Sequence, residues 1–291
     1  MSSTKPTILI QLDTDDQPSV FDGVVAVDSG VDQLFRHAKV TPAKVRDLVH
    51  GAIFTRGPAD LHRTGIFIGG SDVAAAEAIL GAVKDAFFGP FRVSVLFDAN
   101  GANTTAAAAV LAALQGMDGS LQGVRAAVLA ATGPVGQRAA RLLGRLGAEV
   151  SVGSRSRERA RATASALGQV LGKPVRPFAT THEADLMSGL QDAQVVIAAG
   201  ASGVVLLPGA IREKLPELRV AIDLNAVPPL GIEGLIATDK KTDREGVMAW
   251  GALGVGGTKM KIHKAAIQTL FQRNDALLDA EEILEIGRSL R

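Results

Sequence analysis

The residues best suited to chemistry lie in the segment 125–138, Arg-Ala-Ala-Val-Leu-Ala-Ala-Thr-Gly-Pro-Val-Gly-Gln-Arg. This pattern predicts a short buried strand, a tight turn containing Gly133 and Gly136, and then a helix. Because glycine has no side chain, backbone N–H groups of the turn can approach a diphosphate, and the helix directs its positive N-terminus at the same anion. We therefore expect a dinucleotide to contact Thr132, Gly133, Pro134, Val135 and Gly136.

The turn departs from the usual G-x-G-x-x-G fingerprint, because Ala131 occupies the position of the first glycine. Glycine turns between a strand and a helix also arise for packing reasons, and this alternative stays open for the motif alone. The order of strand, turn, helix, second strand and basic loop, at a spacing of about 20 residues, favours dinucleotide binding.

The second strand, predicted over 148–153, is followed by Ser154-Arg155-Ser156-Arg157. NAD-binding proteins usually carry an acidic residue here for the ribose 2′-hydroxyl, whereas arginine suits a 2′-phosphate. We therefore expect NADP as the cofactor, with Ser154, Arg155 and Arg157 near its 2′-phosphate; a solvated helix start is the alternative for the arginines. The expected cofactor site also includes Ala199, at the end of a predicted strand, and Asn225, at the start of a turn-rich stretch.

The composition argues against several other functions. The chain has 31 basic and 30 acidic residues, a net charge of +1, and so lacks the basic excess that grips a nucleic acid. It has no cysteine, and its five histidines lack metal-site spacing, so we expect neither disulfides nor a bound metal. No apolar run reaches the roughly 18 residues of a membrane span and no apolar signal opens the chain, so we expect a cytoplasmic protein with no membrane partner.

Alternating strands and helices are expected to position these residues. In the first 100 residues the pattern predicts three strands and helices that begin near Pro18, Pro42 and Ser71, an α/β layout. After a helix that begins near Thr104, further alternation predicts a doubly wound parallel sheet. Besides the short strand that opens the segment 125–138, the strands expected in order are 7–12, 64–68, 92–97, 148–153, 175–179, 194–199 and 219–223, and helices are expected over about 157–171 and over 183–190.

The last quarter of the chain is predicted to be turn-rich at first and helical at its end. Turns are expected over 225–231 and 251–257, followed by helices over about 258–273 and 279–290. We expect the closing helices to return to the N-terminal domain and the substrate cleft to lie between two domains, with the main boundary near residues 98–102.

A series of motifs runs along nearly the whole chain, at residues 11–15, 17–22, 53–57, 66–70, 87–93, 100–106, 132–136, 225–232 and 251–263. In this order the motifs resemble the bacterial NADP-dependent methylene-tetrahydromethanopterin dehydrogenases of C1 metabolism. The resemblance implies a Rossmann-like NADP domain, residues 101–272, inserted in a smaller α/β catalytic domain of residues 1–100 and 273–291. It also implies a homo-oligomer, with a trimer as the expected form.

The same resemblance implies an activity and two catalytic residues. Such enzymes oxidise the methylene group of a tetrahydromethanopterin-type carrier to a methenyl group, and the likeness assigns catalysis to Asp22 and Lys259. Hydride removal from a carbon between two nitrogens leaves a delocalised cation, so no general base is required and geometry with electrostatics must dominate. Asp22 would stabilise the positive charge or hold pterin N–H groups, and Lys259 would orient a pterin carbonyl.

The alternative for Asp22 and Lys259 is a solvated surface position. Lys259 is expected near a helix N-terminus, where a cation opposes the helix dipole, and this unfavourable placement favours a functional role. Three further residues, Asn103, Thr104 and Lys261, are expected to contact substrate; simple helix capping remains open for Asn103 and Thr104.

Asp13, Asp15 and Asp16 form a run of carboxylates near the start of the chain. We interpret them as loop or cap residues, because hydride transfer needs no Lewis acid. Two other functions remain open. One is a different two-domain NADP oxidoreductase, such as a methylene-tetrahydrofolate dehydrogenase, and the other is an NADP-binding sensor without turnover.

Overall fold

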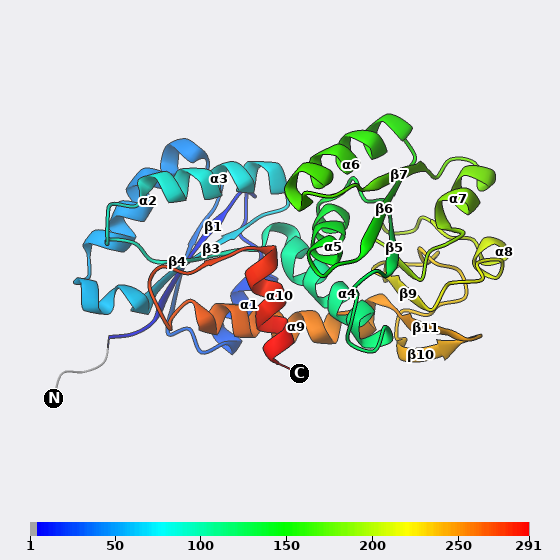
Figure 1. Cartoon of the computed structure of the whole chain (residues 1–291). Coiled ribbons are helices and arrows are strands. Elements are labelled where there is room, and N and C mark those ends of the chain that lie inside the picture. The colour runs from blue at the N-terminus through cyan, green and yellow to red at the C-terminus, as the bar shows by residue number, and fades with distance from the viewer. Residues whose placement is uncertain (1–4, 291) are drawn as a thin grey trace. The chain divides into compact units, whose positions relative to one another are not determined.

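The computed structural model describes residues 5–290, and the chain falls into two compact units (Figure 1). The first unit contains the chain up to Thr104 and from Met260, and the second runs from Thr105 to Lys259. Residues 260–272 therefore group with the first unit, whereas the sequence assigned them to the NADP domain. Packing explains the difference, because the Leu270 side chain lies 3.2 Å from where a Cβ at Gly65 would be.

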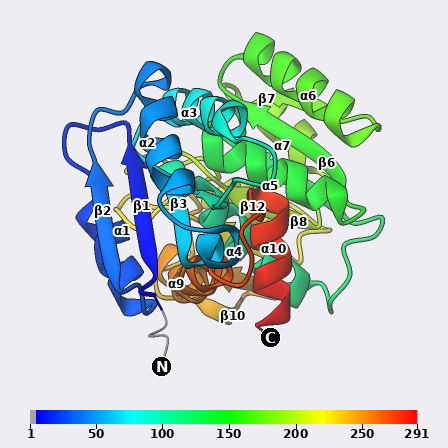
Figure 2. The same ribbon diagram turned by 90° about the vertical axis from the view of Figure 1, so that its left-hand side faces the viewer.

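Within the described residues, the first unit holds a five-stranded parallel sheet in the order β12-β4-β3-β1-β2 (Figure 2). This order is that of flavodoxin-like doubly wound sheets, with the switch point between β1 and β3. The sequence missed β2, a half-exposed edge strand with polar residues, and β12, which has only two residues. The strands are β1 (Ile8–Asp13), β2 (Gln33–His37), β3 (Thr64–Gly69), β4 (Ser94–Phe97) and β12 (Leu277–Leu278).

Helices flank this sheet, and the predicted start signals act largely as expected. Pro42 occupies the first turn of α2, and Val45, Val49 and Ile53 form its buried face. The cap of α3 is Asp72 rather than Ser71: the Ala75 N–H donates to Asp72 Oδ1 at 3.0 Å. The helices of this unit are α1 (Val20–Asp28), α2 (Pro42–Phe54), η1 (Pro58–Arg63), α3 (Val73–Ala86), η2 (Ala99–Gly101) and α10 (Ala280–Ser289). Two helices contain a boundary between the units: α4 (Ala102–Gly116) belongs to the second unit from Thr105, and α9 (Ala252–Thr269) belongs to the first unit from Met260.

The second unit holds a seven-stranded sheet in the order β10-β11-β9-β8-β5-β6-β7, counted over the described chain. Over the described residues, β10 and β11 pair antiparallel and the other neighbouring strands of this sheet pair parallel. Counted from β5, the parallel strands follow the 3-2-1-4-5-6 order of dinucleotide-binding sheets, so the predicted α/β fold class is confirmed. The hairpin β10–β11, with its polar first strand, was missed.

The strands β6 to β9 and the helices α6 and α7 lie at or within about one residue of their predicted ranges, whereas the short helix α8, like β10 and β11, was not predicted. The elements that lie wholly in this unit are β5 (Arg125–Leu129), α5 (Pro134–Arg145), β6 (Glu149–Ser154), α6 (Arg157–Leu171), β7 (Arg176–Ala179), α7 (Glu183–Leu190), β8 (Val195–Ala198), α8 (Gly209–Arg212), β9 (Val220–Asp223), β10 (Lys240–Arg244) and β11 (Val247–Trp250). In the part of the chain that the structure describes, no helix is long and apolar enough to cross a bilayer.

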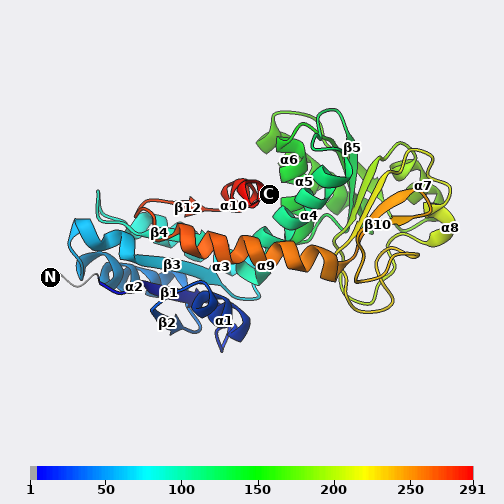
Figure 3. The same ribbon diagram turned by 90° about the horizontal axis from the view of Figure 1, so that it is seen from below.

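Residues 252–257 of the glycine-rich stretch belong to α9, which begins directly after Gly251 and which Figure 3 shows as one continuous helix. The predicted turn over these residues is therefore wrong. Its glycines allow a close backbone approach instead: a Cβ at Gly251 would lie 2.1 Å from the Ile236 carbonyl oxygen, and one at Gly254 would lie 1.9 Å from the Asp239 carbonyl oxygen. Lys259 consequently lies about two turns inside the helix, and the helix-dipole argument for its function does not hold.

Two alanine substitutions in α9 test this packing. Gly254→Ala is expected to lower the free energy of unfolding by about 1–3 kcal/mol, because its methyl group would overlap backbone. Gly257→Ala is the matched control, since no described atom lies within 4 Å of its new Cβ. It should raise stability by about 0.5–1 kcal/mol through helix propensity. Urea unfolding measures both changes, and equal stabilities would contradict the packing explanation.

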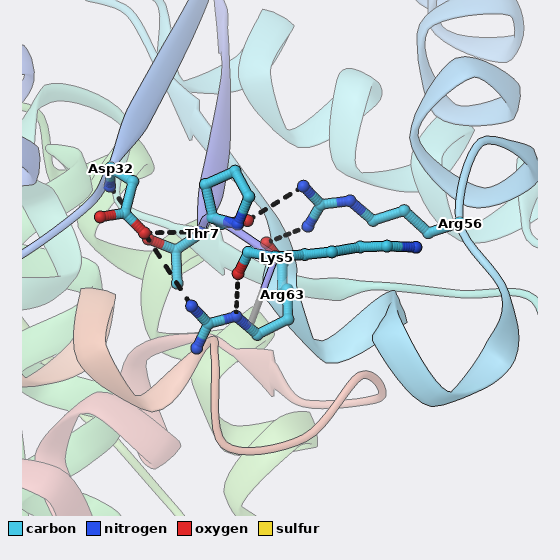
Figure 4. A network of polar contacts seen from close by, with 6 residues as sticks. Lys5, Thr7, Asp32, Arg56 and Arg63 are labelled. Atoms are coloured by element: carbon cyan, nitrogen blue, oxygen red, sulfur yellow. Dashed lines mark hydrogen bonds and ion pairs between the residues drawn. The ribbon is translucent and has the colours of Figure 1, made fainter. Parts of the chain in front are cut away.

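Polar contacts hold the start of the first unit in place (Figure 4). The Arg56 guanidinium donates to the carbonyl oxygens of Pro6 at 2.9 Å and Arg63 at 2.8 Å. Asp32 Oδ2 accepts the Thr7 N–H at 2.7 Å and its hydroxyl at 2.8 Å. These bonds tie the residues before β1 to η1 and to the start of β2.

Asp32 makes this part of the fold sensitive to acid. The Thr7 backbone N–H, followed by its hydroxyl, lowers the pKa of Asp32 below the ordinary value of 3.8. Since the folded pKa is the lower one, the stabilisation is fully present above the unfolded pKa and is lost as pH falls through the folded pKa. Asp32→Asn should therefore reduce stability near neutral pH, and the difference from wild type should narrow below pH 3.8.

Urea unfolding across this pH range measures the effect. Asp47→Asn, on the exposed side of α2, is the control and should change stability little at any pH. A difference for Asp32→Asn that stays constant with pH would contradict the assignment.

Candidate active site

The predicted cofactor residues lie along the carboxyl edge of the second sheet. Residues 132–136 follow β5, residues 154–157 end β6 and begin α6, and Ala199 follows β8. The strand order reverses between β5 and β8, and there the Ala199 N–H donates to the Leu129 carbonyl oxygen at 3.1 Å. Ligands of open α/β sheets bind outside the carboxyl ends of the strands at such a switch point. The structure therefore brings these predicted residues to one edge.

The turn after β5 leads directly into the N-terminus of α5. Gly133 is the N-cap of this helix and Pro134 is its first residue, where the missing N–H costs nothing. The Gln137 side-chain amide donates to the Thr132 carbonyl oxygen at 2.9 Å and braces the turn. Since the first N–H groups of a helix lack intrahelical acceptors, this end of α5 can hold an anion.

The two glycines of the turn differ in whether the surrounding protein leaves room for a side chain. A Cβ at Gly136 would lie 2.7 Å from Ala131 Cα, so the helix packs on the turn only with glycine there. A Cβ at Gly133 would meet only the Ala130 carbonyl oxygen, at 3.7 Å, so packing does not demand glycine. The left-handed residue of the turn is Ala130, with φ of 55°, rather than Ala131. Gly133 thus leaves the space beside the turn open.

The loop after β6 presents its two arginines differently. Arg157 donates to Asp185 Oδ1 at 2.9 Å and is partly neutralised by that pair. Arg155 is exposed and pairs with no carboxylate among residues 5–290, and its carbonyl oxygen accepts the Thr181 hydroxyl at 2.8 Å. Ser156 caps α6 by accepting the Arg159 N–H at 3.2 Å. Arg155 is therefore the better placed of the two for a phosphate.

Asn225 organises its own loop. Its side-chain amide donates to the carbonyl oxygens of Val227 at 2.9 Å and Pro229 at 3.0 Å, and its Oδ1 accepts the Val227 N–H at 2.9 Å. Beside it, the buried Asp223 accepts the N–H groups of Asn225 and Ile232, and burial raises the pKa of Asp223. The Asn225 side chain thus shapes the loop after β9, and these bonds occupy it.

In the first unit, Asp22 lies in the first turn of α1. Its N–H donates to the Ser19 hydroxyl at 3.2 Å, which caps the helix. The neighbouring Phe21 ring is centred 6.3 Å from His263, and the Phe67 ring of β3 stacks on His263 at 5.8 Å. Lys264 Nζ lies 3.0 Å from Asp28 Oδ2 at the other end of α1. Helix α1 therefore packs along the C-terminal half of α9.

Helix α9 carries both predicted lysines, on different faces. Lys259 and His263 are four residues apart and so share a face, whereas Lys261 lies about 200° around the helix from Lys259. Lys261 is exposed. The sequence analysis did not single out His263 as a site residue. Its spacing of four residues from Lys259 indicates that the two side chains share a face of a helix.

Asn103 and Thr104 are fully buried and form hydrogen bonds at the start of α4. Asp98 Oδ1 accepts both of their N–H groups at 2.9 Å, and Asp98 Oδ2 accepts the Thr104 hydroxyl at 2.6 Å. The Asn103 amide donates to the Phe97 carbonyl oxygen at 2.6 Å and to Asp279 Oδ1 at 2.8 Å. This geometry favours a role at the helix start over substrate contact, with Asp98 supplying the cap.

The early carboxylates act as loop acceptors, as the sequence predicts for Asp13 and Asp15. Asp15 accepts the Ser71 backbone N–H at 3.0 Å and its hydroxyl at 2.7 Å, and these bonds lower the pKa of Asp15. Asp16 forms an exposed ion pair with Lys39 at 3.1 Å. Across the described residues, no group of three His, Cys, Asp or Glu side chains is arranged to hold a metal.

Solved structures resemble the chain in fold. A putative malic enzyme matches with a TM-score of 0.61 and 16% identity, covering 99% of this chain and 77% of that one. Quinate dehydrogenase from Corynebacterium glutamicum in complex with NAD matches with a TM-score of 0.53 and 16% identity, covering 98% of this chain and all of that one. At this identity the likeness concerns the fold alone.

Sequence relatives are more informative. The "Bifunctional protein MdtA" of Methylorubrum extorquens is 44% identical over 283 residues, which cover 97% of this chain and 98% of the relative. The "NAD(P)-dependent methylenetetrahydromethanopterin dehydrogenase" of the same organism is 32% identical, covering 89% and 90%. Residues 20–100 match the family model described as "Methylene-tetrahydromethanopterin dehydrogenase, N-terminal". The family that the motifs indicate is therefore confirmed: this chain belongs to the methylene-tetrahydromethanopterin dehydrogenases.

Proposed function

We propose that the protein is an NADP-dependent dehydrogenase that oxidises the methylene group of methylene-tetrahydromethanopterin to the methenyl form. The observation that carries this proposal is the β5–α5 turn, left open at Gly133 on the switch-point edge of a chain from this family. NADP, when bound, supplies the acceptor for the hydride of the methylene carbon. Residues 132–136, Ala199 and Arg155 would hold it, and Gly133 is the position where a Cβ would fill the cradle.

Two residues of this chain act on the substrate in the proposal. The methylene carbon loses a hydrogen with its electron pair, so positive charge develops over the two flanking nitrogens. The Asp22 carboxylate stabilises this charge, and the Lys259 ammonium orients a pterin carbonyl. We leave Asn103, Thr104 and Lys261 out of this contact set, because the first two are bonded internally and the third faces away from Lys259.

We also propose that residues 105–259 are an NADP domain inserted in a substrate domain, supported by their place between the two parts of the first unit. As the resemblance implies, we propose a homo-oligomer with a trimer as the expected form, and the mass of the protein in solution tests this proposal.

Absorbance of the reduced nicotinamide tests the function directly. Purified protein mixed with NADP and methylene-tetrahydromethanopterin should produce NADPH, seen as a rise in absorbance. A parallel reaction with methylene-tetrahydrofolate compares the turnover of the two carriers. Tight NADP binding without turnover on either carrier would favour a sensor and overturn the proposal.

Arg155 tests the preference for NADP. Arg155→Ala should weaken NADP binding by about 10-fold or more while leaving NAD binding nearly unchanged, because a charge-assisted bond to phosphate contributes about 1.5–3 kcal/mol. The matched control is Arg161→Ala, another exposed arginine on α6, further from the loop. Equilibrium titration with both dinucleotides measures the ratio. A parallel loss for NAD and NADP would place Arg155 away from the 2′-phosphate.

A further inference from the structure

Asp13 is a fully buried carboxylate at the carboxyl end of β1, beside the switch point of the first sheet. It accepts three hydrogen bonds: from the Gln11 side-chain amide at 3.1 Å, from the Asp15 N–H at 2.9 Å and from the Ser19 N–H at 3.1 Å. A buried charge is costly unless such bonds compensate it. Two of the three donors are backbone groups of the loop between β1 and α1, so the carboxylate fixes that loop.

A second group holds the same loop from the neighbouring strand. Arg36 of β2 donates through Nε to Gln11 Oε1 at 3.0 Å, and its terminal nitrogen donates to the Pro18 carbonyl oxygen. Gln11 is itself fully buried and links Arg36 to Asp13. We call Gln11, Asp13 and Arg36 the β1 clamp. The β1 clamp forms hydrogen bonds with Pro18 and Ser19, the last two residues before α1.

Hydrogen bonds of Ser19 connect the β1 clamp to Asp22 in the first turn of α1. The Ser19 backbone N–H is bonded to Asp13, while the Ser19 hydroxyl accepts the Asp22 N–H at 3.2 Å. Only one residue, Ser19, therefore stands between the buried carboxylate and the backbone of Asp22. A shift of the Ser19 backbone would move the start of the helix and the carboxylate that it carries.

We propose that Asp13 is a positioning residue for Asp22, acting through the β1 clamp and Ser19. The proposal rests on the function proposed above, in which the Asp22 carboxylate stabilises the positive charge of the reacting carrier. Asp13 itself is buried and bonded to the protein, so its effect on the reaction passes through the backbone of α1. Small displacements of a group that stabilises a transition state are costly, up to about 100-fold in rate for about 1 Å.

A double-mutant cycle tests the proposal. Asp13→Asn keeps the shape of the side chain but leaves one oxygen to accept, and should lower kcat by about 10-fold or more with an NADP Kd within about twofold of wild type. In an Asp22→Ala background the same change should lower kcat no further, because the group being positioned is gone.

Asp98→Asn is the matched control for the cycle. Asp98 is also buried, follows a parallel strand of the same sheet and accepts N–H groups at the start of the next helix, α4. Asp98→Asn should change kcat by the same factor in the wild-type and in the Asp22→Ala background, as expected for a structural residue that acts independently of Asp22. If Asp13→Asn fails to fold, Arg36→Met repeats the cycle from the exposed end of the β1 clamp, with a smaller loss that also disappears in Asp22→Ala.

The outcomes separate this inference from the proposed function. An active wild type in which Asp13→Asn keeps full kcat, or loses the same factor with and without Asp22, overturns the inference alone. A wild type that binds NADP without oxidising the carrier overturns the proposed function, and the positioning role with it.

Discussion

Lys259→Ala is expected to lower kcat by about 100-fold while changing the Kd for NADP by less than about threefold. The proposed role of Lys259 is to orient the carbonyl of the carrier, and loss of orientation lowers the rate of the chemical step far more than it weakens the dinucleotide. The substitution should not unfold α9, because alanine is the stronger helix former. Steady-state turnover and a separate NADP titration give the two quantities.

Lys261→Ala is the control for this experiment. It removes the same charge from the same helix two residues away, on a face that does not include Lys259. Its kcat should stay within about twofold of wild type. Full activity of a correctly folded Lys259→Ala variant would remove Lys259 from the active site, and an equal loss in both variants would indicate a general effect of charge.

Gly133→Ala is expected to weaken NADP binding by about 10- to 100-fold with little change in stability. The backbone of Gly133, with φ of −81° and ψ of 163°, suits alanine, and the new Cβ would meet only one protein atom, at 3.7 Å. The methyl group would instead occupy the space above the turn where we place the diphosphate. Steric overlap in a rigid site costs about 1–3 kcal/mol of binding free energy, which corresponds to that loss of affinity.

Gly136→Ala, three residues further, provides the contrast. Its Cβ would lie 2.7 Å from Ala131 Cα, so we expect it to lower the melting temperature as well as NADP affinity. Thermal unfolding without dinucleotide and titration with it separate the two effects. Unchanged affinity in Gly133→Ala would mean that no diphosphate approaches this turn.

Periodicity predicted most of the second unit, because its parallel strands are short apolar runs and its helices have clear start signals. The ranges predicted for helices α6 and α7 agree with the structure. Periodicity failed to predict the largely exposed strands β2 and β10, because their polar residues form no apolar pattern. It also failed at residues 251–257, where glycine was interpreted as a turn signal although it serves helix packing.

For the candidate site, the sequence identified individual residues better than their relationships. It singled out Gly133, Arg155, Asp22 and Lys259, and the proposed function assigns a role to each of the four. It also favoured Asn225, whose side chain turns out to be bonded within its own loop. Spacing along the chain shows which residue types are present, but not whether their hydrogen bonds are already used.

The sequence by itself determined the α/β class, the strand, glycine turn and helix of 125–138, and the family, because these depend on local patterns and on motifs that keep their order. The tertiary structure alone decided that Gly136 is needed for packing while Gly133 is not, and that Asp13 holds the residues before α1. Both results depend on atoms that approach within a few ångströms, as Arg36 approaches Gln11 from a strand 25 residues away. Such contacts follow from how the elements pack, which no local pattern records.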